Sequence, residues 1–88
     1  MKIEVRKPEP NELENSDILN WGIWECEPST FDWTYSDKET CYLLEGEVTV
    51  NTDTETVSFG AGDIVVFPAG LSCVWEVKQT VRKHYKFG

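Results

Sequence analysis

The chain has 88 residues, with 16 acidic and 8 basic side chains and a formal net charge of −8. This length leaves room for one domain, which we assign to residues 1–88, with a motif-bearing core at about 21–87. The negative charge argues against nucleic acid and anionic membranes as partners, because both are bound through basic patches. No apolar run approaches the roughly 20 residues that cross a bilayer. The first twenty residues are too polar for a secretory signal, so we expect a cytoplasmic protein.

Strand-like segments follow one another along most of the chain. Residues 2–6 alternate, and Pro8 and Pro10 end that strand. Residues 11–15 predict one helical turn. The further strands are predicted at 21–25, 31–35, 41–44, 47–50, 57–59, 64–67, 73–77 and 81–87. Turn residues at 51–54 predict a hairpin, and many short strands with close turns predict an all-β fold, a single small antiparallel barrel.

Three cysteines, Cys26, Cys41 and Cys73, lie far apart in the sequence and form no C-x-x-C pair. Their odd number and wide spacing argue against a disulfide framework and against a zinc ribbon. We therefore expect three reduced thiols.

Two segments have spacings that resemble the signatures of the cupin superfamily. Glu39 is separated by six residues from Gly46, and residues 62–73 read G-x5-P-x-G-x2-C. The family signatures read G-x5-H-x-H-x3-E-x6-G and G-x5-P-x-G-x2-H-x3-N. Trp33, Tyr35 and Cys73 stand where the three metal-binding histidines would be. The resemblance thus implies the barrel and gives no metal centre, and we expect no cofactor.

A closer resemblance covers nearly the whole chain, from about residue 21 to residue 87. The segments that carry it are W-E at 24–25, F-D-W-T-Y at 31–35, E-T-C-Y-L-L-E-G-E-V-T-V at 39–50, G-D-I-V-V-F-P-A-G-L at 62–71, W-E-V at 75–77 and K-H-Y at 83–85. They are similar to the short single-domain cupins of the third cupin-domain type, the ureidoglycine aminohydrolase-like group. The resemblance implies an RmlC-like jelly roll. It does not imply the aminohydrolase activity, because the histidines of that enzyme's manganese site are missing here.

Alternation along the strands predicts which side chains face the barrel interior. If Glu39 points inward, as the resemblance implies, one inner set contains Trp33, Tyr35, Glu39, Cys41, Cys73 and Trp75. Trp24 and Glu25 lie on an early strand that could reach the same mouth. We predict that Trp24, Glu25, Trp33, Tyr35, Cys41 and Trp75 contact a ligand. An aromatic wall with few polar groups is typical of a small-molecule pocket.

The candidate catalytic residues are Glu39, Cys73 and Lys83. Glu39 could serve as a general acid or base, with Cys73 or Lys83 assisting. The alternatives remain open at this stage: Glu39 as a structural carboxylate bonded to Tyr35 or to a backbone amide, and Lys83 on a solvated basic strand. A second alternative places a divalent metal on Glu39, Cys41 and Cys73, since thiolate and carboxylate both ligate zinc.

The sequence thus predicts a small-molecule-binding cupin, either a metal-independent enzyme acting on a small polar metabolite or a non-catalytic barrel. The non-catalytic alternatives are a ligand-binding sensor and a structural barrel that binds a partner. A homodimer is a possible assembly. An unfilled cavity would favour the first two functions over the structural one.

Overall fold

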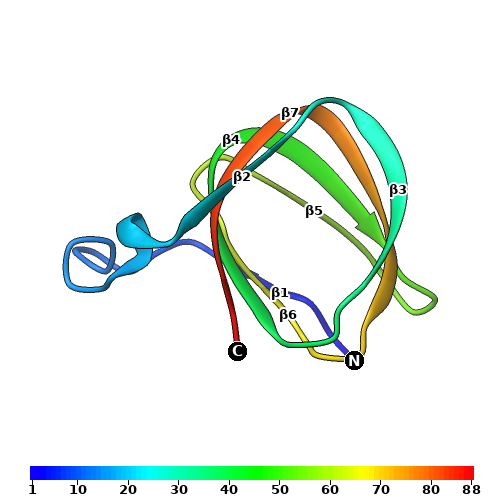
Figure 1. The fold of residues 1–88 in the computed structure, drawn as a ribbon, viewed down its shortest axis with the longest axis horizontal. Helices are drawn as coiled ribbons and strands as arrows, with labels where there is room; N and C mark the ends of the chain where they lie inside the picture. Colours follow the sequence, from blue (N-terminus) through cyan, green and yellow to red (C-terminus); the bar gives the residue numbers. More distant parts are fainter.

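The computed structural model describes residues 1–88, and strands account for most of the chain (Figure 1). The elements are β1 (Glu4–Arg6), a 3-10 helix η1 (Ile18–Asn20), β2 (Gly22–Cys26), β3 (Ser29–Thr34), β4 (Glu39–Asn51), β5 (Thr56–Gly60), β6 (Ile64–Phe67) and β7 (Ser72–Phe87). All strand pairs are antiparallel. The all-β prediction is therefore confirmed. No helix here has the length and apolar character needed to pass through a bilayer.

Two predicted boundaries are wrong because two strands are much longer than their apolar segments. The segments at 41–44 and 47–50 belong to the single strand β4, and those at 73–77 and 81–87 belong to β7. Backbone pairing runs through the polar residues between them, which alternation alone does not reveal. The predicted helical turn at 11–15 is a turn closed by one backbone hydrogen bond, from Asn15 N to Asn11 O at 2.9 Å.

The long strands β4 and β7 pair with each other and organise the barrel. The sheet order is β1-β6-β4-β7-β2, and β3 and β5 pair with β7 and β4 outside that path. β4 pairs first with β6 and then with β5, whereas β7 pairs first with β3 and then with β2. Each long strand therefore changes neighbour halfway along, so the sheet curls around a central space (Figure 1).

The bend in β4 lies at Gly46, where the pairing with β7 shifts register. Gly46 has φ +111°, and a Cβ there would lie 2.7 Å from the Cα of Val81. Only glycine fits such a close backbone approach at positive φ. The inward positions of β4 are Cys41 and Leu43 before the bulge and Val48 after it. The extra residue thus changes the phase of the alternation, as bulges do.

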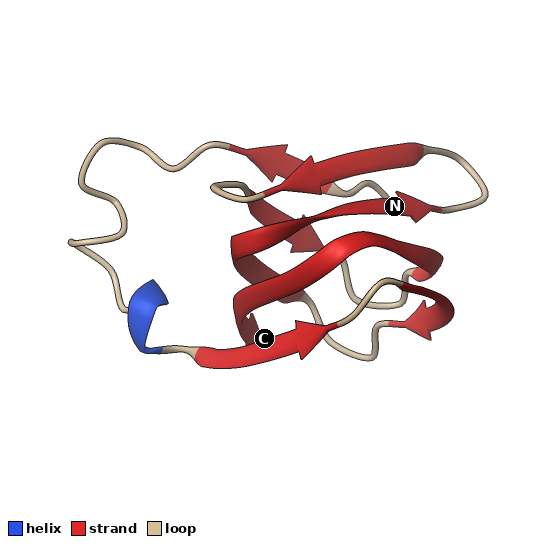
Figure 2. Cartoon of the chain, turned by 90° about the horizontal axis from the view of Figure 1, so that it is seen from above, coloured by secondary structure: helices blue, strands red, loops and turns tan.

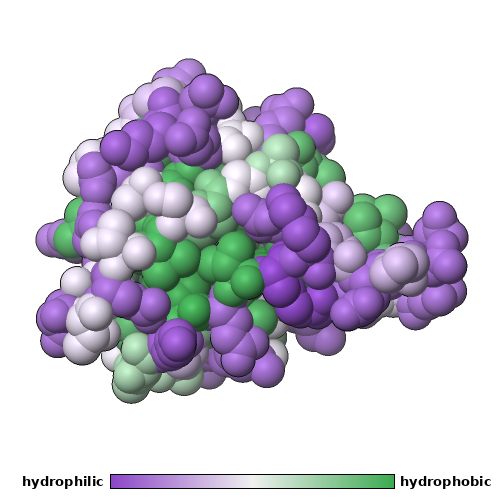
Figure 3. All heavy atoms as spheres, turned by 180° about the vertical axis from the view of Figure 1, so that it is seen from behind, coloured by the Kyte–Doolittle hydropathy of each residue, from purple (hydrophilic) through white to green (hydrophobic).

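The interior is filled from β4 and β7 with help from the shorter strands. The buried hydrophobic cluster consists of Ile3, Tyr35, Cys41, Leu43, Val48, Val50, Phe59, Val65, Phe67, Leu71, Cys73, Trp75, Val77 and Val81. The segment between β1 and β2 projects to one side of the barrel and carries η1 (Figure 2). From behind, apolar side chains gather at the centre of the face inside a hydrophilic frame, and the projecting segment is mostly hydrophilic (Figure 3).

Candidate functional site

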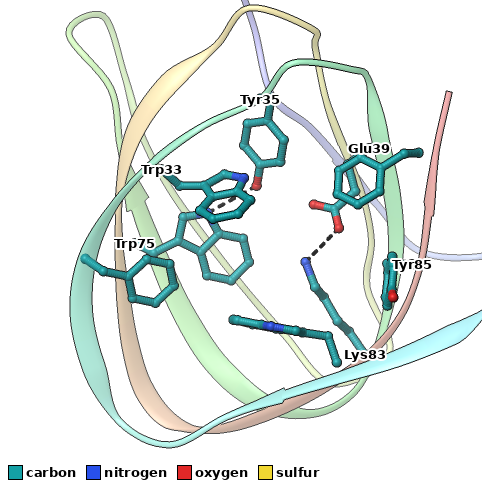
Figure 4. Close-up of a pocket in the computed structure, with 9 residues that line it drawn as sticks. Trp33, Tyr35, Glu39, Trp75, Lys83 and Tyr85 are labelled. Atoms are coloured by element: carbon teal, nitrogen blue, oxygen red, sulfur yellow. Dashed lines mark hydrogen bonds and ion pairs between the residues drawn. The ribbon is translucent and has the colours of Figure 1, made fainter.

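A cavity of about 210 Å³ lies inside one end of the barrel. Most of its walls are aromatic, and two of its side chains carry charge. The lining residues are Trp24 on β2, Phe31 and Trp33 on β3, Tyr35 and Glu39 around the start of β4, and Trp75, Lys83, Tyr85 and Phe87 on β7. Figure 4 shows the polar ends of Tyr35, Glu39 and Lys83 pointing toward one another across the cavity.

Lys83 occupies an inward position of β7 that the alternation would give to an apolar side chain. It shares a face with Trp75 and is 4% exposed. Its Nζ donates a hydrogen bond of 3.0 Å to Glu39 Oε2. The ammonium also lies 5.0 Å from the ring centroid of Trp24 and 4.8 Å from that of Trp75. A carboxylate and two indole faces thus hold the buried cation.

Glu39 opens β4, where it lies between Phe67 of β6 and Phe87 of β7. These neighbours leave it 4% exposed. The carboxylate has one hydrogen-bond partner in the protein, Lys83, and that bond uses Oε2. Oε1 accepts no hydrogen bond from the protein and is not sealed away from the cavity. This oxygen is therefore a free acceptor for a molecule inside the pocket.

Tyr35 supplies a third polar group. Its hydroxyl oxygen accepts a hydrogen bond of 3.2 Å from Trp75 Nε1. The ring stacks on Phe67 with centroids 4.8 Å apart, and this contact fixes its direction. Burial, reinforced by the negative charge of Glu39, raises the pKa of Tyr35 far above its usual value. Tyr35 thus stays a phenol, and its own proton has no acceptor in the protein, so it can be donated to a ligand.

The aromatic walls pack against one another and form a rigid frame. Trp75 lies at the centre: its ring stacks on Phe31 at 6.0 Å and meets Trp24 edge-to-face at 5.9 Å. Such pairs stabilise by roughly 1 kcal/mol each beyond the burial of their area. Trp33 and Phe87 are each 47% exposed although both line the cavity. They therefore form the rim of its mouth.

Five of the predicted ligand-contacting or catalytic residues on inward positions meet at this cavity: Trp24, Trp33, Tyr35, Trp75 and Glu39. Lys83 joins them. The open alternative that placed Lys83 on a solvated strand is wrong, because the odd-numbered positions of β7 from Cys73 to Lys83 face inward, apart from Gln79 at the bulge. Arg82 and Lys86, by contrast, lie outside the cavity.

The structure does not bring the two inward cysteines to the cavity. Cys41 is fully buried, and its thiol points at Val65 O, 3.7 Å away. Cys73 is buried next to the cavity, paired with Trp33 across β3 and β7, but it does not line the cavity, and its thiol lies 3.6 Å from Trp33 O. Burial raises the pKa of both thiols, that of Cys41 to about 12. The structure therefore places the Cys73 thiol, in its protonated form, outside the cavity that holds Glu39.

Glu25 also lies apart from the cavity, so the expected second carboxylate is missing. It is exposed because it follows the inward Trp24, and successive strand residues face opposite sides. On the outer surface its Oε1 lies 2.9 Å from Arg82 Nε, an ion pair without hydrogen-bond alignment. Glu39 is thus the lone acid of the pocket.

Sequence reasoning missed three cavity residues, Phe31, Tyr85 and Phe87. The signal was present in the alternation: Phe31 shares a face with Trp33, and Tyr85 and Phe87 continue the face of Lys83. Tyr85 and Phe87 were missed because the terminal segment was interpreted as a solvated strand.

The side chains at the cupin metal positions do not fit a metal. Trp33 and Tyr35 replace two histidines, and the thiol of Cys73 replaces the third and is directed at Trp33 O. No group of three histidine, cysteine or acidic side chains lies close enough to hold an ion, so the alternative set of Glu39, Cys41 and Cys73 is not formed. The Lys83 ammonium stands beside Glu39, where it would repel a metal cation.

Comparison with known proteins agrees with the fold. The model of the EutQ-like cupin domain matches residues 13–85. The chain belongs to the EutQ-like cupin family. A crystal structure of a DUF861 family protein from Thermotoga maritima is 44% identical, covers 99% of this cupin and 100% of its own chain, and superposes with a TM-score of 0.95. The cupin jelly roll predicted from the sequence is thereby confirmed.

Two EutQ proteins share the same barrel. The acetate kinase EutQ of Clostridioides difficile (strain 630) is 32% identical over 73 residues, which are 83% of this cupin and 46% of that protein. The crystal structure of a putative ethanolamine utilization protein Q from Salmonella typhimurium is 32% identical with a TM-score of 0.69 over 75% of this cupin and 54% of that chain. This cupin thus spans about half the length of its EutQ relatives.

Proposed function

We propose that this cupin binds a small molecule in the aromatic cavity and does so without a metal ion. One observation carries the proposal: an ammonium, a free carboxylate oxygen and a free phenol proton, from Lys83, Glu39 and Tyr35, converge on one cavity with aromatic walls. Mostly apolar cavities with a few convergent polar groups are the usual form of ligand sites. The unfilled volume of about 210 Å³ also counts against the alternative of a filled structural barrel.

The three polar groups define the chemical class of the ligand. Lys83 and Tyr35 donate hydrogen bonds, so they match a carbonyl or carboxylate oxygen. Glu39 Oε1 accepts one, so it matches an N–H or O–H on the same molecule. The flat rings of Trp24 and Trp75 favour a flat ligand body. A small carbonyl compound, amide or hydroxy acid meets these requirements.

The second candidate is an enzyme in which Glu39 moves a proton to or from the ligand. The direct 3.0 Å contact between Glu39 and Lys83 favours it, because a paired acid and base is the minimum equipment for proton transfer. The kinase activity in the name of the EutQ relative belongs to a protein about twice as long, so here acetate is only one candidate carboxylate. Three unpaired cysteines suit a reducing, cytoplasmic environment.

A ligand screen tests the proposal. Trp24, Trp33 and Trp75 line the cavity and Trp21 does not, so binding should change tryptophan fluorescence as well as raise the melting temperature. The panel should hold small carboxylates, acetate among them, amides, aldehydes and ketones. We expect at least one ligand whose affinity falls about tenfold in Tyr35→Phe, equal to roughly 1.4 kcal/mol.

The control is Lys78→Met, which removes an exposed lysine of β7, the strand that also carries Lys83. It should leave the affinity unchanged. A panel in which no compound changes either signal, or in which Tyr35→Phe and Lys78→Met bind equally well, would overturn the proposal.

A further inference from the structure

Lys83 differs from every other lysine of the chain in its surroundings. It is buried, whereas Lys2, Lys7, Lys38, Lys78 and Lys86 are exposed. Burial of a lysine is rare unless the charge is paired. Here the pairing does not close the site, because Nζ makes one hydrogen bond to protein and faces a cavity that a small molecule can enter. The amine is thus placed where it can meet a ligand.

Lys83 lies beside a carboxylate, Glu39, that can accept the proton an ammonium must lose before it reacts as a nucleophile. An ammonium is not a nucleophile until it loses a proton, and Glu39 Oε2 accepts a hydrogen bond from it at 3.0 Å. The proton can therefore pass along an existing hydrogen bond without water. Tyr35 completes the site with a free phenol proton for a ligand oxygen.

We infer that Lys83 is an imine-forming residue, which attacks the carbonyl carbon of a small aldehyde or ketone while Glu39 carries the protons. This inference rests on the proposed function, since it names the ligand class of the same cavity. It also gives a use to the carboxylate oxygen and the phenol that the protein leaves unpartnered.

The step balances within the pocket. Lys83 gives a proton to Glu39, and the neutral amine forms a bond to the carbonyl carbon as the C=O π bond breaks. The oxygen takes the proton from Glu39, which then removes one of the two protons left on the nitrogen. The C–O bond of this carbinolamine breaks, and the oxygen leaves as water with the proton that Glu39 held. The products are an iminium cation on Lys83, the Glu39 carboxylate and one water.

The surroundings hold the product as well as they hold the free lysine. The nitrogen carries one positive charge before and after the reaction, so the Glu39 carboxylate and the faces of Trp24 and Trp75 contact a cation throughout. The iminium group is planar and suits a cavity between flat rings.

Reductive trapping tests the inference on the wild-type protein. The folded protein is incubated with benzaldehyde, or with propanal as an aliphatic probe, and with sodium cyanoborohydride at neutral pH. Peptide mapping by mass spectrometry then locates the alkylated lysines. We expect Lys83 to be labelled ahead of the exposed lysines, and its advantage to vanish when the protein is unfolded in urea. Labelling confined to exposed lysines with both probes would overturn the inference.

Two variants separate the roles in the pocket. Lys83→Arg keeps the cation and should abolish the fast labelling. Glu39→Gln should slow labelling of Lys83 by about 100-fold and leave the exposed lysines unaffected, because proton transfer is then lost. Equal labelling of Lys83 in Glu39→Gln and wild type would show that Glu39 carries no proton and would overturn its role in proton transfer.

The failure of this inference differs from failure of the proposed function. A compound that raises the melting temperature and changes tryptophan fluorescence, while Lys83 is never trapped by either aldehyde, leaves the binding site standing and removes imine formation. Absence of binding by every compound of the panel removes the site itself.

Discussion

Lys83 Nζ and Glu39 Oε2 lie 3.0 Å apart, and each side chain is 5% exposed. Transfer of two charges from water into such a site costs several kcal/mol per ion, and their attraction offsets that cost only when both are present. The pair as a unit therefore adds little to the free energy of unfolding. Removal of either charge, however, leaves the other buried without a partner and lowers the free energy of unfolding.

A double-mutant cycle measures this dependence. Glu39→Gln and Lys83→Met should each lower the free energy of unfolding by about 3 kcal/mol, because each leaves one buried charge unpaired. The double variant should lose clearly less than the sum, with a coupling energy of about 2 kcal/mol in urea denaturation. As the control, the exposed pair of Glu25 and Arg82 should show a coupling below about 1 kcal/mol. Additive losses at the inner pair would contradict the prediction.

Tyr35→Phe isolates the hydroxyl from the ring. The variant keeps the stacking on Phe67, while Trp75 Nε1 loses its hydrogen-bond acceptor, so we expect a loss of about 1 kcal/mol in the free energy of unfolding. Tyr42→Phe is the control, because Tyr42 lies on the face of β4 that points away from the barrel interior and its hydroxyl has no partner in the protein. Equal losses in the two variants would show that the bond to Trp75 is unimportant.

The three thiols should react at different rates. Cys26 is only half-buried, whereas burial raises the pKa of Cys41 and Cys73, which keeps both protonated at neutral pH. Since the thiolate is the reactive form, a disulfide reagent should modify one thiol quickly in the folded protein and all three after denaturation. Cys26→Ser should remove the fast phase. A fast phase that persists in this variant would contradict the placement of the other two.

The same burial makes stability fall at alkaline pH. The pKa of Cys41 is about 12 in the folded chain against an ordinary 9.0, so above about pH 9 the unfolded chain has lost a proton that the folded chain retains. Stability then decreases as pH rises. Cys41→Ala should show a shallower decline in unfolding free energy from about pH 8 to about pH 10 than wild type. Val48→Ala creates a comparable cavity and removes no titrating group. It should lower the unfolding free energy at every pH without changing its slope against pH.

Gly46 and Gly62 provide a matched pair of backbone tests. Both have positive φ, but a Cβ at Gly46 would lie 2.7 Å from Val81 Cα and 2.8 Å from Thr80 O. At Gly62 the nearest atom would be Lys7 Nζ at 3.8 Å. Gly46→Ala should therefore cost about 3 kcal/mol or more, and Gly62→Ala about 1 kcal/mol, in thermal or urea unfolding. Equal costs would mean that the backbone contact is relieved by movement.

The fold followed from the sequence because local signals agreed with one another. The turn residues at 51–54 correctly predicted the hairpin of β4 and β5, and the alternating segments on either side of them lie in those two strands. The continuity of β4 and β7 did not follow. It depends on pairing between distant strands, and a bulge is invisible to a search for regular alternation.

The cavity was predicted in part, and the errors have separate causes. Glu39, Tyr35 and Trp75 were placed by strand parity and by the cupin spacing. Cys73 shares that parity and pairs with Trp33, but it does not line the cavity, because parity gives the face of a strand and not the packing of side chains over each position. The direction of the Lys83 side chain was left undecided, because a buried lysine is expected only where a paired carboxylate is known.

The pairing of β4 with β7 also determines when the site exists. Glu39 and Lys83 lie 44 residues apart, and the strands that bear them make the central ladder of the barrel. Strands so far apart in the sequence pair late in folding, because the chain between them loses conformational entropy before their contacts can stabilise the pair. During synthesis the Glu39 carboxylate therefore has no ammonium partner until β7 has been made. A ligand that contacts both groups would bind only the finished barrel, and would slow its unfolding without speeding its folding.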